Sequence, residues 1–265
     1  MWRLSGLGLS LALLLWFSFG QDGSAAALSQ RTVDLVDSRP AHSILLVGNS
    51  RTYFNHMPSM IREIADSAGS PTKYQIEVSA LPAYTFEKHW SEGRTRRLLN
   101  AGWDDVILQA ASVEQWNPET EAKFIEFGTK LAGAARVNGE RPRLVVNWAY
   151  DTSMYEREFE GEGSEARAYY LERIRASHSD LAAKTNMSRI NMVGLWESVR
   201  HSRPAIKLTI DGNHPTVAGS YLYALAIYSS LSQGQVAGVT YAPDGVKPED
   251  AKALREAVDA YPLSS

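Results

Sequence analysis

The sequence contains no cysteine among its 265 residues, and this absence excludes several kinds of protein. Without thiols the chain forms no disulfide bond, thiolate metal site or cysteine-linked lipid anchor, so its stability must come from a buried core. It has 27 lysine and arginine residues against 30 aspartate and glutamate residues, a net charge of -3. Because no long basic run is present, the chain offers no electrostatic reason to bind nucleic acid.

Long apolar runs are also scarce, and the longest one lies at the start of the chain. The stretch "MWRLSGLGLSLALLLWFSFG" has one arginine before its apolar residues, and small residues suited to cleavage follow in "GSAAALSQ". This pattern predicts a signal peptide over residues 1–27, and therefore a secreted or periplasmic protein without stable membrane insertion after cleavage. A membrane anchor is the alternative, but the run is short for a span and lacks strong flanking charges.

Beyond this segment, short apolar runs alternate with helical patterns, and no linker or internal repeat interrupts them. Residues 28–42 are predicted to be a leader segment, and residues 43–265 a single α/β domain. A five-stranded parallel sheet covered by helices on both faces is predicted from this alternation. The predicted strands are 43–48, 74–80, 104–110, 143–150 and 189–196, and the predicted helices are 57–65, 86–101, 117–139, 166–181, 215–232 and 248–260.

The stretch "SILLVGNSRTY" delivers Ser50 just past the carboxyl end of the first predicted strand. In open α/β sheets, functional sites form at the carboxyl ends of the strands. Gly48 permits a sharp turn, and amide groups around such a turn can point at an anion. Ser50 is therefore a candidate nucleophile, although Gly-Asn-Ser is also ordinary turn chemistry at the end of a strand.

A nucleophilic serine needs a base, and the stretch "DGNHP" near the C-terminus offers one. The proline after His214 steers it away from helical angles and suits the first turn of a helix, so His214 should lie on a loop. Asp211, three residues earlier, can accept a hydrogen bond from one ring nitrogen and leave the other free to take a proton from the serine. The alternative is a capped helix start with an exposed histidine.

Together these two motifs resemble those of the SGNH (GDSL-like) hydrolase superfamily. The stretches "ILLVGNSRTYFNHMP" and "DGNHPTVAGSYLYALAIY" are similar to its first and last conserved blocks, with asparagine where many members have aspartate. The resemblance implies a flavodoxin-like three-layer α/β/α fold and serine esterase or deacylase chemistry without a metal or organic cofactor. It also implies that Ser50 is the nucleophile, His214 the general base and Asp211 the residue that orients it.

This sequence departs from the family's usual pattern at the two middle conserved blocks. The second strand leads into "SALPAYTFEKHW", which lacks the expected glycine, so a backbone amide near Ala83 is the expected substitute for that oxyanion donor. The third strand ends in "VILQAAS", where Gln109 is predicted to donate from its carboxamide alongside the Ser50 amide. The alternative for Gln109 is a buried amide that closes a polar network at a strand end.

His89, Trp90 and Trp148 lie just beyond strand ends and are predicted to line a substrate cleft, although packing between layers is the commoner fate of tryptophans. The histidines show no metal-ligand spacing, and no phosphate-cradling glycine-rich loop follows the first strand. The resulting hypothesis is an exported serine hydrolase acting on a small acyl ester or an acylated carbohydrate. An acyltransferase using the same residues and a non-catalytic ligand-binding protein are the alternatives, and the sequence leaves the oligomeric state open.

Overall fold

The computed structural model describes residues 37–137, 139, 141–158 and 163–263. The chain divides into two compact units, Met1–Pro40 and Ala41–Ser265, and the second contains the whole sheet. The predicted signal peptide, residues 1–27, lies outside the described residues. In the part of the chain that is described, no helix has the length and apolar character needed to cross a bilayer.

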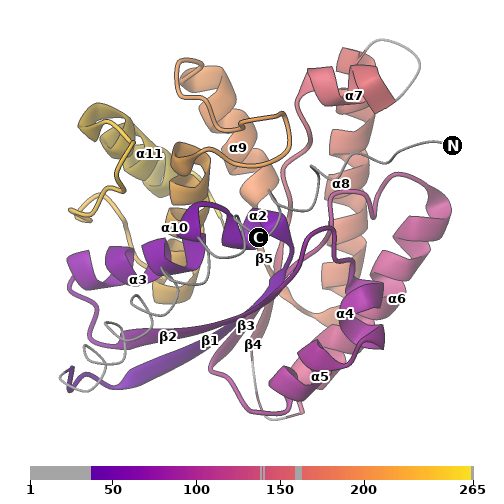
Figure 1. Cartoon of the computed structure of the whole chain (residues 1–265), viewed down its shortest axis with the longest axis horizontal. Helices are drawn as coiled ribbons and strands as arrows, with labels where there is room; N and C mark the ends of the chain where they lie inside the picture. Colours follow the sequence, from indigo (N-terminus) through magenta and orange to yellow (C-terminus); the bar gives the residue numbers. More distant parts are fainter. Residues whose placement is uncertain (1–36, 138, 140, 159–162, 264–265) are drawn as a thin grey trace, which may run out of the picture. The chain divides into compact units, whose positions relative to one another are not determined.

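The second unit is built on a five-stranded sheet in which all neighbouring strands are parallel (Figure 1). The spatial order is β2-β1-β3-β4-β5, with β1 at Ala41–Gly48, β2 at Lys73–Ala80, β3 at Asp105–Gln109, β4 at Arg141–Val145 and β5 at Ser188–Ile190. The predicted five-stranded parallel sheet is thereby confirmed. In β1, Ile44 and Leu46 pack into one core and Leu45 and Val47 into the other, which explains its uninterrupted apolar run.

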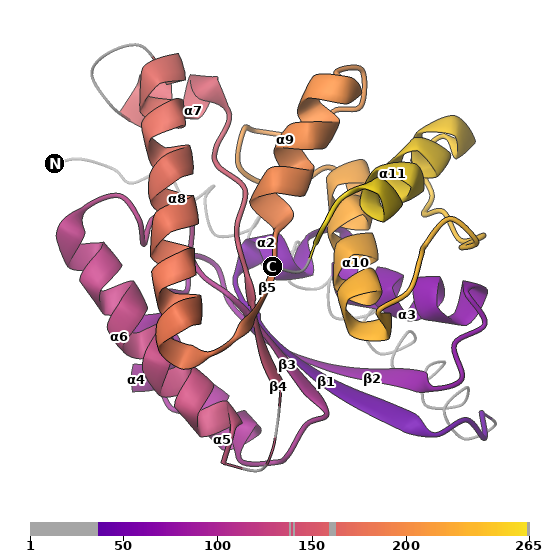
Figure 2. The ribbon, with the colours of Figure 1, turned by 180° about the vertical axis from the view of Figure 1, so that it is seen from behind.

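Helices cover both faces of the sheet, as Figures 1 and 2 show from opposite sides. One face carries α3 (Met57–Ser67), α9 (Met192–Ser202), α10 (Val217–Ser232) and α11 (Pro248–Ala260). The other carries α4 (Phe86–Ser91), α5 (Arg94–Leu99), α6 (Pro118–Ala135) and α8 (Gly163–Thr185). Shorter elements are α2 (Ser50–Tyr53), η1 (Phe54–His56) and α7 (Thr152–Glu158), which packs against α8.

Three predicted elements differ from the structure. The strand predicted over 189–196 ends at Ile190, because Asn191 accepts a hydrogen bond from the Gly194 amide and caps helix α9. The strand predicted over 143–150 ends at Val145. The helix predicted over 86–101 is divided into α4 and α5 by Gly93, whose φ of 77° does not continue a right-handed helix.

The order of the strands determines where a site can form. Strand β1 lies between β2 and β3, so the loops that follow β2 and β3 flank its carboxyl end. In parallel α/β sheets such a reversal of strand order opens a crevice at the carboxyl ends. Ser50 begins α2 at this crevice, two residues after β1 ends.

Candidate active site

The turn that carries Ser50 is fixed by close packing and by a cap. A Cβ atom at Gly48 would lie 2.1 Å from Thr52 Oγ1 and 2.7 Å from Gln109 Oε1, so only glycine fits at this position. Asn49 caps α2 by accepting a hydrogen bond from the Arg51 amide at 3.2 Å. The local geometry therefore explains Gly48 and Asn49, which together place Ser50 at the start of α2.

The structure brings Ser50, His214 and Asp211 into one hydrogen-bonded chain. Ser50 Oγ lies 3.0 Å from His214 Nε2, and His214 Nδ1 lies 2.7 Å from Asp211 Oδ2. When Nδ1–H donates to the carboxylate, Nε2 is left as an acceptor for the serine hydroxyl. This arrangement can activate a serine hydroxyl as a nucleophile.

The loop that presents His214 is held by the same carboxylate. Asp211 Oδ1 accepts hydrogen bonds from the backbone amides of Asn213 (2.9 Å) and His214 (2.7 Å). Gly212, with φ of 87°, takes the left-handed conformation that this tight turn needs. Partial burial opposes ionisation of Asp211, but the hydrogen bonds from the His214 ring and these amides prevail and lower its pKa to about 2.

Aromatic packing fixes the plane of the histidine ring. The Phe54 ring stacks on His214 with centroids 4.8 Å apart and an interplanar angle of 18°. Asn55, with φ of 52°, donates its side-chain amide to the Pro215 carbonyl at 2.9 Å. The segment that follows α2 thus supports the histidine loop, and no local sequence pattern indicates either contact.

Arg51 is a further residue of this region that sequence reasoning missed. Its buried guanidinium donates from Nη1 to the Trp148 carbonyl (2.7 Å) and from Nε to Asn213 Oδ1 (3.0 Å), and it lies 4.4 Å from the Trp148 ring centroid. Burial lowers the pKa of Arg51 to about 10, so it remains charged at neutral pH. Arg51 therefore connects the helix of Ser50 to the histidine loop and to the segment after β4.

Gln109 does not occupy the predicted oxyanion position. Its Oε1 accepts hydrogen bonds from the Asn49 amide (3.3 Å) and from Thr52 Oγ1 (2.8 Å), and its Nε2 donates to the Ala110 carbonyl. The side chain is buried and is absent from the lining of the cavity beside Ser50. The carboxamide thus braces the turn beneath Ser50 and does not face the cavity, as the predicted oxyanion donor would.

Ala83, by contrast, lies where the resemblance implies a glycine. It is exposed, lines the cavity beside Ser50, and has φ of 54°, in the left-handed region that favours glycine. Among the described residues, no acceptor is recorded for its backbone amide. Ser50, which begins α2, lines the same cavity.

The cavity beside Ser50 and His214 has a volume of about 350 Å³. Its walls are mainly apolar and aromatic, and they include Tyr53, Phe54, Pro82, Ala83, Val113 and Tyr150. The Ser112 hydroxyl, 2.7 Å from Tyr150 OH, adds a polar pair to one wall. The cavity is large enough for a group well beyond an acetyl.

The residues predicted to line a cleft are elsewhere. Trp148 is fully buried, stacks on Trp196 with centroids 4.2 Å apart, and supports the histidine loop by donating to the Asn213 carbonyl. His89 is buried and contacts the Gly48 carbonyl through Nε2 at 2.8 Å, and burial lowers its pKa to about 4. Trp90 packs against the core between the sheet and α6. Packing between layers thus accounts for these side chains, and none lines the cavity beside Ser50.

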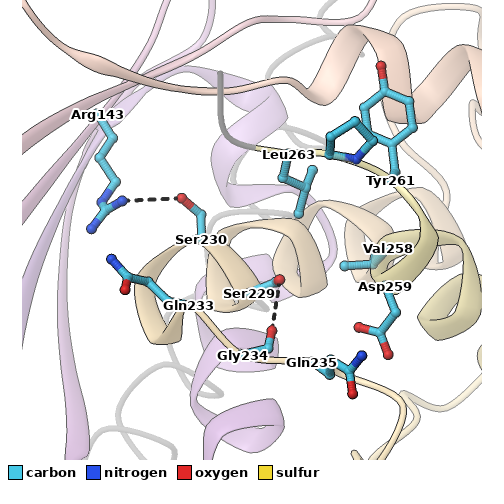
Figure 3. Close-up of a pocket in the computed structure, with 11 residues that line it drawn as sticks. Arg143, Ser229, Ser230, Gln233, Gly234, Gln235, Val258, Asp259, Tyr261 and Leu263 are labelled. Carbon is cyan, nitrogen blue, oxygen red and sulfur yellow. Dashed lines mark hydrogen bonds between the residues drawn. The ribbon is translucent and has the colours of Figure 1, made fainter.

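A larger cavity, of about 520 Å³, lies away from these residues (Figure 3). It is formed at the C-terminal ends of α10 and α11, where Arg143 donates to Ser230 Oγ at 3.4 Å. Arg143 also forms an ion pair with Asp105 at 3.0 Å. None of the candidate catalytic side chains lines this cavity, so its size does not make it the reaction site.

No cluster of three or more histidine, aspartate or glutamate side chains is arranged to hold a metal ion within the described part of the chain. His42, one of the histidines without ligand spacing, contacts Asp105 at 2.9 Å at the opposite end of β1 from Ser50.

Comparison with known proteins gives structural relatives only. No protein-family model matches the sequence, and no curated protein does. A protein from Slackia heliotrinireducens described as an SGNH hydrolase superposes with a TM-score of 0.59 and 22% identity, over 72% of this chain and 99% of that one. A DUF4886 family protein from Bacteroides uniformis superposes with a TM-score of 0.65 and 16% identity, over 83% of this chain and 94% of that one. A variant of an acetyl xylan esterase from Geobacillus stearothermophilus superposes with a TM-score of 0.56 and 14% identity, over 71% of this chain and 94% of that one.

These comparisons establish the architecture of the chain. It has the fold of the SGNH hydrolases, a three-layer α/β/α domain around a five-stranded parallel sheet. The first and last sequence motifs implied this fold, and that prediction is confirmed.

Proposed function

We propose that the chain is a serine hydrolase that cleaves carboxylic esters, with Ser50 as the nucleophile. One observation supports this function most directly, namely the continuous path of hydrogen bonds from Ser50 Oγ through His214 to Asp211 at the carboxyl end of β1. The fold supports the same class of reaction, since SGNH hydrolases and an acetyl xylan esterase share it.

In the proposed mechanism, Ser50 Oγ attacks the ester carbonyl while His214 Nε2 takes the serine proton. Asp211 keeps the Nδ1 proton in place and stabilises the imidazolium that forms. The imidazolium then gives its proton to the departing alcohol, which leaves an acyl-enzyme on Ser50. His214 then takes a proton from a water molecule that attacks the acyl carbonyl, and it returns this proton to Ser50 Oγ as the bond between Oγ and the acyl carbon breaks and the carboxylic acid leaves.

The oxyanion of the tetrahedral intermediate requires donors on the side of the cavity away from His214. We assign this role to the backbone amides of Ser50 and Ala83, because both residues line the cavity and neither donor depends on a particular side chain. Preorganised amides of this kind contribute a large share of the rate enhancement in acyl transfer.

For the substrate, we propose a small acyl ester, with O-acetylated carbohydrate as the class to test first. The fold it shares with an acetyl xylan esterase supports this choice, and the aromatic walls of Tyr53, Phe54 and Tyr150 suit a sugar ring or an apolar acyl group. We also propose that the protein acts outside the cytoplasm, on the strength of the leader pattern in residues 1–27.

The proposal is tested by measuring hydrolysis of p-nitrophenyl acetate and of acetylated xylan by the wild type, Ser50→Ala and His214→Ala. His201→Ala is the matched control, because His201 is an exposed histidine near the end of α9. We expect turnover in the wild type and the control and none above background in the other two variants. A fluorophosphonate that labels Ser50 in the wild type reports the activated serine without requiring the right substrate.

Two outcomes separate the alternatives. Absence of both hydrolysis and labelling would favour a non-catalytic ligand-binding protein and refute the proposed function. Labelling without hydrolysis, together with acetyl transfer to an added sugar alcohol, would indicate an acyltransferase that uses the same residues.

A further inference from the structure

Glu114 lies between β3 and α6, and its carboxyl group is buried although no cation pairs with it among the described residues. Its Oε1 accepts a hydrogen bond from the Phe86 amide at 3.0 Å, and its Oε2 accepts one from the Ala111 amide at 2.6 Å. Both oxygens are therefore used by backbone donors that lie 25 residues apart in the sequence.

The two donors belong to the two loops that flank the carboxyl end of β1. Phe86 begins α4, directly after the loop that contains Ala83, and Ala111 follows β3 at the start of the loop that contains Val113. Both loops supply walls of the cavity beside Ser50. A single side chain thus joins the two walls on either side of the nucleophile.

Burying a carboxyl group is unfavourable, and the effect is visible at this residue. Burial raises the pKa of Glu114 to about 8, although the Phe86 and Ala111 amides oppose the shift. A buried apolar residue would avoid this cost but would leave two backbone donors without acceptors. The contacts of Glu114 therefore point to a role in holding the two loops at a defined separation.

We propose that Glu114 is a positioning residue that holds the Ala83 loop and the 111–113 wall in register with Ser50. This inference rests on the proposed function, because its catalytic consequence follows from the assignment of the Ala83 amide as an oxyanion donor. A loop displaced by about 1 Å weakens a donor aimed at the transition state far more than it weakens binding of the ground state.

The test compares Glu114→Gln with Glu126→Gln, in which an exposed glutamate on α6 is changed in the same way. The glutamine at position 114 keeps the volume and one acceptor oxygen, but its NH₂ group faces the second backbone amide. We expect kcat for p-nitrophenyl acetate, per fluorophosphonate-titrated site, to fall about 10–100-fold with KM within about threefold. The control should match the wild type in both constants.

Amide hydrogen exchange gives a second measurement that does not depend on turnover. We expect the Ala111 and Phe86 amides to exchange at least about tenfold faster in Glu114→Gln than in the wild type and the control. Unchanged kcat, or a change in KM alone, would overturn the proposal, as would unchanged exchange at both amides.

Each possible failure has a distinct signature. If the wild type hydrolyses no ester, the proposed function fails, and hydrogen exchange still decides whether Glu114 holds the loops. If Glu114→Gln does not fold, hydrogen exchange in the wild type tests the proposal. An Ala111 amide that exchanges in the wild type at the rate of an unstructured chain would overturn it.

Discussion

Replacing Gln109 by methionine distinguishes two roles of its carboxamide, which are the support of the turn beneath Ser50 seen in the structure and the donation to the oxyanion predicted from the sequence. Methionine keeps nearly the same length and volume but removes the carboxamide. The Asn49 amide and the Thr52 hydroxyl then lose the acceptor that Gln109 Oε1 provides, and both residues are buried. The Ala110 carbonyl stays satisfied, because the side-chain amides of Asn49 and Asn147 also donate to it.

The magnitude follows from the two donors that are left without an acceptor. Each buried donor that loses its acceptor costs about 1–3 kcal/mol, so Gln109→Met should lower the free energy of unfolding by about 2–6 kcal/mol. Urea denaturation measures this change through the midpoint and slope of the transition. Gln75→Met, on an exposed position of β2, is the matched control and should shift the free energy by less than about 0.5 kcal/mol.

The catalytic effect of Gln109→Met should be small by comparison. Because the carboxamide does not line the cavity, we expect kcat per titrated active site to fall less than about tenfold, through a looser turn beneath Ser50. A loss of about 100-fold or more in kcat at an unchanged urea midpoint would show that Gln109 donates to the oxyanion after all, and would refute this reasoning.

Three other predictions test the histidine loop, its helix and the buried acid. Asp211→Asn should lower kcat about 10⁴-fold with little change in fold, because the amide oxygen stays on the Asn213 and His214 backbone donors and the NH₂ group replaces the oxygen that selects the His214 tautomer. Steady-state kinetics and circular dichroism check this. Gly219→Ala should lower the free energy of unfolding in urea by about 1–3 kcal/mol, because its Cβ would lie 2.2 Å from the Leu208 carbonyl oxygen. Gly133→Ala is the control, because its Cβ would meet nothing within 4 Å and should stabilise the protein by up to about 1 kcal/mol in the same assay. Glu114 has a folded pKa of about 8, above its ordinary 4.5, so the stability that its protonated form contributes should be lost as pH rises from 5 to 8.5. Burial lowers the pKa of His89 and His178 to about 4, which acts in the opposite direction but equally in the wild type and in Glu114→Gln. The free energy of unfolding of the wild type minus that of Glu114→Gln, measured in urea at both ends of this range, should therefore fall as pH rises.

The alternation of strands and helices could be predicted because both faces of the sheet are covered. Such a sheet needs short continuous apolar runs, and each of them is separated from the next by a helical pattern. The same property explains the failure at 189–196. Met192, Val193 and Leu195 are apolar and buried, so a short run of them fits a buried strand as well as a helix. Asn191 caps the first turn of α9, and these apolar residues are therefore helical.

The proximity of Ser50 and His214 could also be predicted, because each motif is local and the topology places their ends together. A strand end at the crevice and a histidine before proline are visible within a few residues of sequence. Gln109 and Trp148 differ, because their orientation depends on partners about 60 residues away, Asn49 for the first and Asn213 for the second. Sequence pattern located both side chains at strand ends but could not determine which way they point.

Ala83 shows why a missing residue type is a weak guide to a missing donor. The sequence lacks the glycine expected after β2, and such an absence on its own favours a non-catalytic protein. The backbone of Ala83 nevertheless adopts φ of 54°, at a cost of about 1–2 kcal/mol for a residue with a Cβ atom. Strain of this kind persists where surrounding contacts impose it, and it gathers at functional sites. Glu114 is one such contact, because it holds Phe86 three residues beyond Ala83. The conformation at position 83 is therefore set by the loop around it, and the loop can present its amide to the cavity without a glycine.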